Sequence, residues 1–253
     1  IILQYVQGIR KRQPQIGCRK LHIHMQEELF VRSEIRIGRD GLIDLLRREN
    51  LLVKRRKKRP VTTDSNHAFR RYPNLIRNKI ATAINEVWVS DITYIDTEEG
   101  YLYLFLITDV YSRKIIGYHV GITMEAIGAI AALKKALHEL PEESHTIHHS
   151  DRGLQYACTD YTKILHNKTI QISMTENGDP LENCIAERVN GLIKSLIQGA
   201  YNSKLEALKS IPEIINIYNK EVKHGSIGML TPQQAYESKI PLINTWKGKQ
   251  SVA

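Results

Sequence analysis

The sequence has few cysteines and no long apolar segment. Its three cysteines are widely spaced and include no CxxC pair, which argues against a disulfide framework or a zinc site and fits a reducing cytosol. No window approaches 18 apolar residues and no secretory signal is present, so neither a membrane span nor export is expected. Internal repeats and low-complexity tracts are also lacking.

Positive charge is in excess. Lys and Arg number 36 against 27 Asp and Glu, which gives a net charge of +9 over 253 residues. This length allows one large or two modest domains, and 42% hydrophobic residues are typical of a globular protein. The excess of cations favours a polyanionic partner, most commonly nucleic acid, although a merely soluble basic protein has the same balance.

Residues 1–53 have the periodicity of short amphipathic helices. Apolar residues recur at helical spacing before Pro14, again from Leu21 to Leu29, and in a third segment that Asp40 is expected to cap. Short helices with glycine-containing turns are typical of a helix-turn-helix-like DNA-binding module, although any small bundle has this pattern.

Six consecutive cations follow this segment and end at Pro60. Most charge runs are solvated tracts, and that alternative stays open. Because the run leads into a polar stretch ahead of a new pattern, we interpret residues 54–86 as a basic linker that lies along DNA. The predicted contacts of the run are Lys54, Arg55, Arg56, Lys57, Lys58 and Arg59.

The pattern over residues 87–199 is that of an α/β domain. Three consecutive strands precede a helix capped by Thr123, and strand, helix, strand and a long helix follow. This order is that of the ribonuclease-H-like fold, with a mixed five-stranded sheet and flanking helices. Residues 200–253 are predicted to form a helical tail. The predicted strands are 88–95, 101–107, 114–120, 145–150 and 169–174, and the last helix is 181–198.

Two acidic residues of this domain are candidates for chemistry on phosphodiesters. Two divalent cations can clamp both oxygens of an in-line displacement, and Mg²⁺ prefers a few carboxylates as ligands. Asp91 lies in the middle of a strand, where a carboxylate is costly unless it is paired or bound to a cation. Asp151 follows a strand end, where ligand sites gather in α/β sheets. Taken singly, each could equally be a salt-bridged or turn residue.

The third carboxylate is harder to choose from the residues. Glu182 points about 140° away from Glu187 on a helix, so both are not expected to face one site. A helical face with one acid, amides and a lysine suits a metal ligand beside a phosphate-bearing strand, although polar surface faces are common. The acidic candidates are Glu176, Asp179, Glu182 and Glu187. The shared face carries Asn183, Glu187, Asn190, Gly191 and Lys194.

Other polar residues receive secondary roles. We interpret Asp109 as a structural or turn acid, because the strand that it ends cannot easily aim it at Asp91. His148 and His149 lack a partner His or Cys at ligand spacing, so we expect strand histidines that touch the ligands or the substrate rather than a metal. Asn183 and Asn190 are candidates for the same contacts.

These residues lie in sequence motifs that resemble those of the integrase-like transposases of bacterial insertion sequences. More narrowly, they resemble the second-reading-frame product of the IS-three family. Between Asp151 and Glu187 lie 35 residues, the spacing that this family shares with retroviral integrases, and Lys194 matches the family's basic residue seven positions after the glutamate. The matching motifs are WVSDITY at 88–94, IHHSDRGLQY at 147–156, SMT at 173–175, ENCIAERVNGLIK at 182–194, and Tyr218-Asn219 with His224 and Thr231-Pro232.

The resemblance implies a DDE-type transposase. Asp91, Asp151 and Glu187 would hold two Mg²⁺ ions, with Mn²⁺ as a substitute, and Lys194 would contact DNA phosphate. The implied reaction is cleavage at transposon ends and transfer of the 3′-hydroxyl into target DNA. The implied partners are double-stranded DNA of the inverted repeats and target, further copies of the chain in a synaptic complex, and an upstream-frame product. The implied location is the bacterial cytoplasm, at the nucleoid.

Two departures from the family pattern stand out. The usual Arg-Pro before the late histidine is Val222-Lys223 here, in a peripheral segment. The family product is normally fused by frameshifting to an upstream helix-turn-helix and leucine zipper, and no such segment precedes Ile1, where the chain begins without Met. We therefore expect a fragment in which end recognition and synapsis are incomplete.

Two other functions use the same residues. A stand-alone nuclease or resolvase on this fold would have the same carboxylates, and a non-catalytic product that represses transposition would have the same charge. With pre-cleaved end DNA and Mg²⁺, joined products indicate a transposase and cut products alone a nuclease.

Overall fold

The computed structural model describes residues 1–53, 70–142, 144–176 and 180–238. The chain divides into two compact units: of the described residues, the first contains 1–53 and 195–198, and the second contains the remainder, up to 194 and from 199 to 238. Among the described residues, no helix combines the length and the apolar character needed to cross a membrane.

The first unit is a small helical bundle. Its core is a single apolar cluster in which Val6 packs with Leu21, Met25, Leu42 and Leu46. These apolar residues recur at helical spacing in the sequence, and the short helices predicted from that spacing are present. The elements are α1 (Ile2–Arg12), α2 (Cys18–His24), a π-helical turn η1 (Met25–Leu29), α3 (Phe30–Arg32) and α4 (Arg39–Arg48).

The predicted cap of α4 is wrong. Gly38 occupies the N-cap position without a side-chain cap, and Asp40 lies in the first turn of the helix. An acidic residue there interacts favourably with the positive end of the helix dipole, which explains why its position resembles that of a cap.

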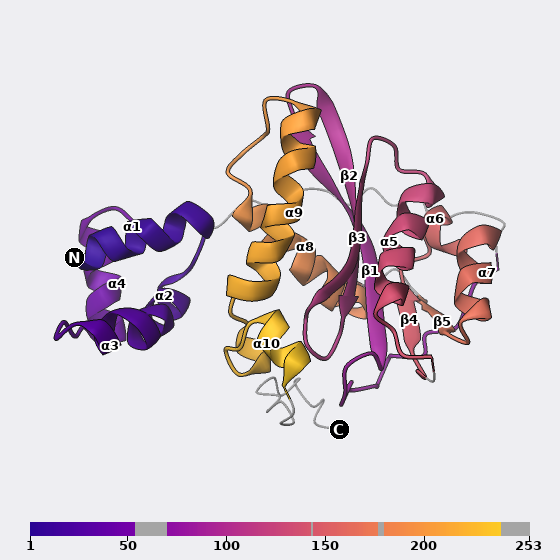
Figure 1. The fold of residues 1–253 in the computed structure, drawn as a ribbon, viewed down its shortest axis with the longest axis horizontal. Coiled ribbons are helices and arrows are strands. Elements are labelled where there is room, and N and C mark those ends of the chain that lie inside the picture. The colour runs from indigo at the N-terminus through magenta and orange to yellow at the C-terminus, as the bar shows by residue number, and fades with distance from the viewer. Residues whose placement is uncertain (54–69, 143, 177–179, 239–253) are drawn as a thin grey trace. The chain divides into compact units, whose positions relative to one another are not determined.

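The second unit is built on a mixed five-stranded sheet, as predicted. The strand order is β3-β2-β1-β4-β5 (Figure 1). The first three strands in sequence are antiparallel, and β4 and β5 run parallel to β1. The strands are β1 (Val87–Thr97), β2 (Gly100–Asp109), β3 (Ile115–Gly121), β4 (Ile147–Ser150) and β5 (Gln171–Met174).

Helices cover both faces of this sheet. Figure 1 shows α5, α6 and α7 on one face and α8 and α9 on the other. The helices and helical turns are α5 (Ala126–His138), α6 (Leu154–Ala157), α7 (Thr159–Asn167), η2 (Pro180–Asn183), α8 (Cys184–Leu196), α9 (Lys204–Glu221), η3 (Gly225–Ile227) and α10 (Pro232–Glu237).

One apolar cluster fills the space under α5, α6 and α7. It joins Trp88 and Phe105 of the sheet to Leu133, Tyr156 and Tyr161 of the helices. The ring of Phe105 lies so close to Gly128 of α5 that a Cβ atom there would be 2.3 Å from it. The helix can therefore rest on the sheet at this point because glycine has no side chain.

Two helix starts in this unit differ from the prediction. The helix α5 has Glu125 as its N-cap, and the hydroxyl of Thr123 donates to the Glu125 carboxylate at 3.1 Å instead of capping the helix. The expected long helix 181–198 is divided into the 3-10 turn η2 and the helix α8. The predicted start at Thr231 is confirmed, since its side chain accepts from the Gln234 N–H in a capping box.

The described part of the expected linker packs against the edge strand β5. Met174 N–H donates to Pro73 O at 3.3 Å, and Leu75 N–H donates to Ser173 Oγ at 2.9 Å. Residues 70–76 thus belong to the core unit and cover a sheet edge that would otherwise be open to pairing. The basic run 54–59 lies outside the described residues.

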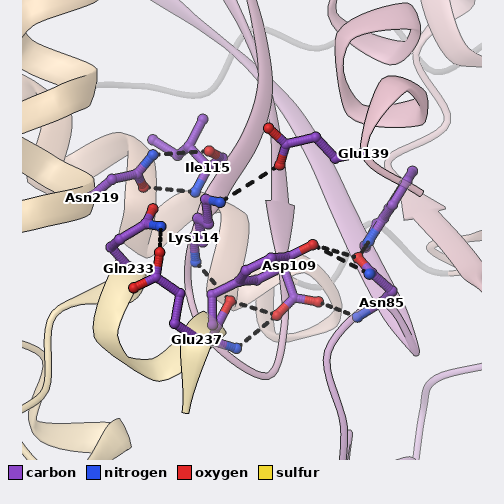
Figure 2. Close-up of polar contacts among 11 residues, drawn as sticks. Asn85, Asp109, Lys114, Ile115, Glu139, Asn219, Gln233 and Glu237 are labelled. Atoms are coloured by element: carbon purple, nitrogen blue, oxygen red, sulfur yellow. Dashed lines mark hydrogen bonds and ion pairs between the residues drawn. The ribbon is translucent and has the colours of Figure 1, made fainter. Parts of the chain in front are cut away.

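The tail binds the opposite edge of the sheet. Asn219 of α9 uses both ends of its amide on one residue of β3: it donates to Ile115 O and accepts from Ile115 N–H, each at 3.0 Å (Figure 2). Tyr218 O–H donates to Arg113 O at 2.8 Å. The family motif Tyr218-Asn219 therefore has a structural role, because it attaches the described part of the helical tail to the core.

Candidate active site

Asp91 lies on β1 and is half-buried. Its Oδ1 accepts from the N–H of Ile92 at 2.9 Å, and its Oδ2 accepts from the Nδ2 of Asn190 at 2.7 Å. The amide of Asn190 comes from α8, so one hydrogen bond ties the predicted helical face to the predicted strand carboxylate.

Asp151 lies one residue beyond the end of β4. In the parallel pairing of β1 with β4, Val89 is opposite His149. Continuing that register by two residues brings Asp151 level with Asp91. The Asp151 Oδ1 accepts from the N–H of Gly153 at 3.0 Å. A Cβ on Gly153 would lie 2.9 Å from this oxygen, so the turn requires glycine for the close approach.

Glu187 lies in the first turn of α8, and its side chain is exposed. Two asparagines hold this part of the chain against β1. Asn183 Nδ2 donates to Ser90 O at 3.2 Å, and Asn190 binds Asp91 as described. Both asparagines are buried and bind groups of β1, while their predicted contacts with the ligands or the substrate stay a prediction.

The charges of Asp151 and Glu187 both act on Asp91. The pKa of Asp91 is raised from 3.8 to about 7, first by burial and then by the negative charges of Asp151 and Glu187; the hydrogen bonds from Ile92 and Asn190 oppose the rise. Among the described residues, no three His, Cys, Asp or Glu side chains are close enough to form a metal cluster as they stand. Asp91 is thus a half-buried carboxyl on which two like-charged carboxylates act, and all three groups offer oxygen donors only.

This site lies in a domain with known relatives. Two models of an integrase core domain match the chain, over residues 81–180 and 168–232. An uncharacterized 31 kDa protein of insertion element IS600 from Shigella sonnei is 38% identical over 233 residues, which span 90% of this chain and 83% of that protein. The InsF transposase of insertion sequence IS3A from Escherichia coli is 32% identical over 200 residues, which span 77% and 68%.

The chain belongs to the insertion-sequence transposases with an integrase core. The resemblance to the IS-three family is thereby confirmed, and the function of the chain is DNA transposition. A chain of the simian T-cell lymphotropic virus intasome has a similar fold, with a TM-score of 0.54 at 16% identity over 92% of this chain and 75% of that one. This likeness confirms the fold class expected from the order of the elements.

The imidazoles of His148 and His149 are both buried in this transposase, and their expected contacts with the ligands or the substrate stay a prediction. Burial lowers the pKa of His148 to about 3 and that of His149 to about 4, so both are neutral at physiological pH. The Nε2 of His148 lies within hydrogen-bond distance of Ser90 Oγ, and the Nδ1 of His149 lies 2.8 Å from Ser173 Oγ. Both histidines therefore connect neighbouring strands of the sheet.

The alternative acidic residues of this transposase have local partners. Glu182 accepts from Glu176 N–H at 2.7 Å, and Glu176 accepts from Asn74 N–H at 3.2 Å. Asp179 lies outside the described residues. Of the described candidates, Glu187 is the one whose charge acts on Asp91.

Asp109 is the structural acid that the sequence predicts. It is fully buried and accepts hydrogen bonds from the N–H of Asn85 at 2.8 Å and from the N–H and hydroxyl of Ser112 at 2.7 and 2.6 Å (Figure 2). Asn85 in turn donates to the Tyr236 hydroxyl of α10 at 3.2 Å. The carboxylate thus holds the turn after β2, close to the tail and away from Asp91.

The predicted DNA contacts remain predictions. Lys194 is half-buried on α8, two helical turns after Glu187. Gly153 has a role that the sequence did not suggest, because the closeness of its backbone to Asp151 appears only in the folded chain. In the sequence, this role of Gly153 could have been suggested by its position two residues after a candidate carboxylate at a strand end.

Proposed function

We propose that this transposase cleaves DNA at the ends of its element and joins the 3′-hydroxyl to target DNA, with Asp91, Asp151 and Glu187 holding two Mg²⁺ ions. The observation that carries the proposal is the pKa of Asp91, which is raised first by burial and then by the negative charges of Asp151 and Glu187. Three carboxylates that repel one another cost folding free energy unless a cation joins them. The parallel register of β1 and β4 supports the pairing of Asp91 with Asp151 at the end of β4, where α/β sheets bind ligands.

The chain's own groups hold the carboxylates in fixed orientations. Ile92 N–H and Asn190 fix the two oxygens of Asp91, and Gly153 N–H fixes one oxygen of Asp151. When bound, divalent cations would activate the attacking oxygen and stabilise the leaving one in an in-line displacement. Mn²⁺ should replace Mg²⁺ because it also prefers oxygen ligands.

DNA is the proposed partner at several surfaces. The basic run Lys54–Arg59 and Lys194 would bind phosphates of the inverted repeats and the target, which supplies affinity without sequence preference. Two ends must be joined together, so further copies of the chain are expected in the synaptic complex, and an upstream-frame product is a second candidate partner. The proposed location is the bacterial cytoplasm at the nucleoid, where the target DNA lies.

A strand-transfer assay with pre-cleaved end DNA and Mg²⁺ tests the proposal. Asp91→Asn, Asp151→Asn and Glu187→Gln should each abolish cleavage and joining while DNA affinity stays near that of the wild type, because phosphate contacts elsewhere dominate binding. Glu182→Gln is the matched control, since it removes the same charge five residues from Glu187 and should stay active.

Each other outcome has a definite meaning. Cut products without joined ones would indicate a nuclease. An active Glu187→Gln together with an inactive Glu182→Gln would reassign the third carboxylate. Strand transfer by all three variants would overturn the metal-dependent mechanism.

A further inference from the structure

Two buried tyrosines lie side by side beneath the candidate site, and their hydroxyls differ. The rings of Tyr156 on α6 and Tyr161 on α7 are 5.5 Å apart in an edge-to-face arrangement. The Tyr161 hydroxyl lies 2.8 Å from His148 Nε2, which also lies 2.7 Å from Ser90 Oγ. The Tyr156 hydroxyl is buried and has no hydrogen-bond partner among the residues that the structure describes.

An unpaired buried hydroxyl is costly, because the group gives up its hydrogen bonds to water and gains none in the fold. Phenylalanine at position 156 would keep the ring contacts with Tyr161 and His148 without that cost. Packing alone therefore does not explain the hydroxyl, and a partner that is present only when the site is in use would explain it.

The groups around this hydroxyl indicate which partner. Tyr156 lies in the short helix directly after the turn formed by Asp151 and Gly153. Its pKa is raised well above the ordinary value by burial and then by the negative charges of Asp91 and Asp151. The phenol therefore stays protonated at any physiological pH and can only donate to these carboxylates.

We propose that Tyr156 is a positioning residue for the carboxylate pair Asp91 and Asp151, its hydroxyl donating a hydrogen bond to that pair when the pair binds a divalent cation. The inference rests on the proposed function of these carboxylates. Hydrogen bonds from groups behind the ligands fix ligand orientation and increase metal affinity. Tyr156 would act on affinity through Asp91 and Asp151 rather than by touching the substrate.

Thermal unfolding of the full chain, without DNA, at increasing Mg²⁺ concentrations tests the inference. A cation that binds the folded state stabilises it in proportion to its affinity. Tyr156→Phe should leave the unfolding midpoint in EDTA unchanged or higher, because it removes an unpaired hydroxyl. The same variant should raise the Mg²⁺ concentration required for half of the stabilisation by about tenfold.

Tyr161→Phe is the matched control, because it deletes a neighbouring hydroxyl that already has a partner. It should lower the midpoint in EDTA and leave the required Mg²⁺ concentration unchanged. A wild-type Mg²⁺ response of Tyr156→Phe, or a lower midpoint in EDTA, would overturn the inference. Asp91→Asn distinguishes a failure of the proposed metal site from a failure of the role of Tyr156. Full Mg²⁺ stabilisation of that variant would overturn the proposed metal site itself.

Discussion

Replacing Asp91 by Asn should stabilise the metal-free transposase at neutral pH, although it removes a proposed ligand. In the folded chain the pKa of Asp91 is about 7 instead of 3.8. A carboxyl whose pKa is raised by folding binds its proton more tightly in the folded state, so stability falls as pH rises from about 4 to about 7. Asparagine does not ionise and avoids this loss.

The size of the effect follows from the pKa. Each unit corresponds to about 1.4 kcal/mol, so the full penalty is at most about 4 kcal/mol above neutral pH. The Asp91 side chain is partly exposed, and solvent screening reduces the penalty, so we expect Asp91→Asn to gain about 2 kcal/mol.

The hydrogen bonds of Asp91 can survive the substitution. Its oxygens accept from Ile92 N–H and from Asn190 Nδ2. An asparagine at position 91 keeps one acceptor for Ile92 and presents an NH₂ group to Asn190. The Oδ1 of Asn190 is buried and has no partner in the described part of the chain, so turning that amide over would restore the contact.

Urea unfolding in EDTA, followed by the fluorescence of buried Trp88 on β1, measures the difference. Asp91→Asn should unfold at higher urea than the wild type at about pH 8. At about pH 4 both should unfold at nearly the same urea, because the wild-type Asp91 is then protonated and uncharged in the folded state. Mg²⁺ should then stabilise the wild type alone. Equal midpoints at the higher pH, or an equal gain at both, would refute the raised pKa of Asp91 that burial and the neighbouring charges produce.

Other residues give further tests. Replacing the six cations of Lys54–Arg59 by Gln should flatten the log–log salt dependence of DNA affinity by about 2.7 if they engage about three phosphates; an unchanged slope would mean a solvated tract. Lys194→Ala should cost about one unit of that slope and slow joining while Mg²⁺ stabilisation persists, and wild-type joining at low salt would argue against a site contact. Gly153→Ala would put a Cβ 2.9 Å from Asp151 Oδ1, so Mg²⁺ stabilisation should weaken; a wild-type response would contradict the close approach.

Much of the fold could be predicted because local patterns are strong in this chain. The order of strands and helices, the amphipathic helices of the first unit and the capping box at Thr231 all depend on neighbours in sequence. The spacing of Asp151 and Glu187, together with the words around them, was enough to identify the family.

The caps of α4 and α5 were missed for a local reason. An acid or hydroxyl near a helix start can lie before, at or after the cap, and sequence resolves this to within a few residues only. In the structure Gly38 and Glu125 occupy these positions, and Asp40 and Thr123 lie beside them.

The tertiary structure alone decided which polar residues meet. The parallel register of β1 and β4 brings Asp151 level with Asp91. The packing of α8 lets the charge of Glu187 act on Asp91, whereas Glu182 accepts a hydrogen bond from Glu176 N–H. Burial made His148 a structural residue and left the Tyr156 hydroxyl unpaired beneath the site. These outcomes depend on contacts between residues tens of positions apart, and side-chain burial and charge coupling arise only when such segments are brought together.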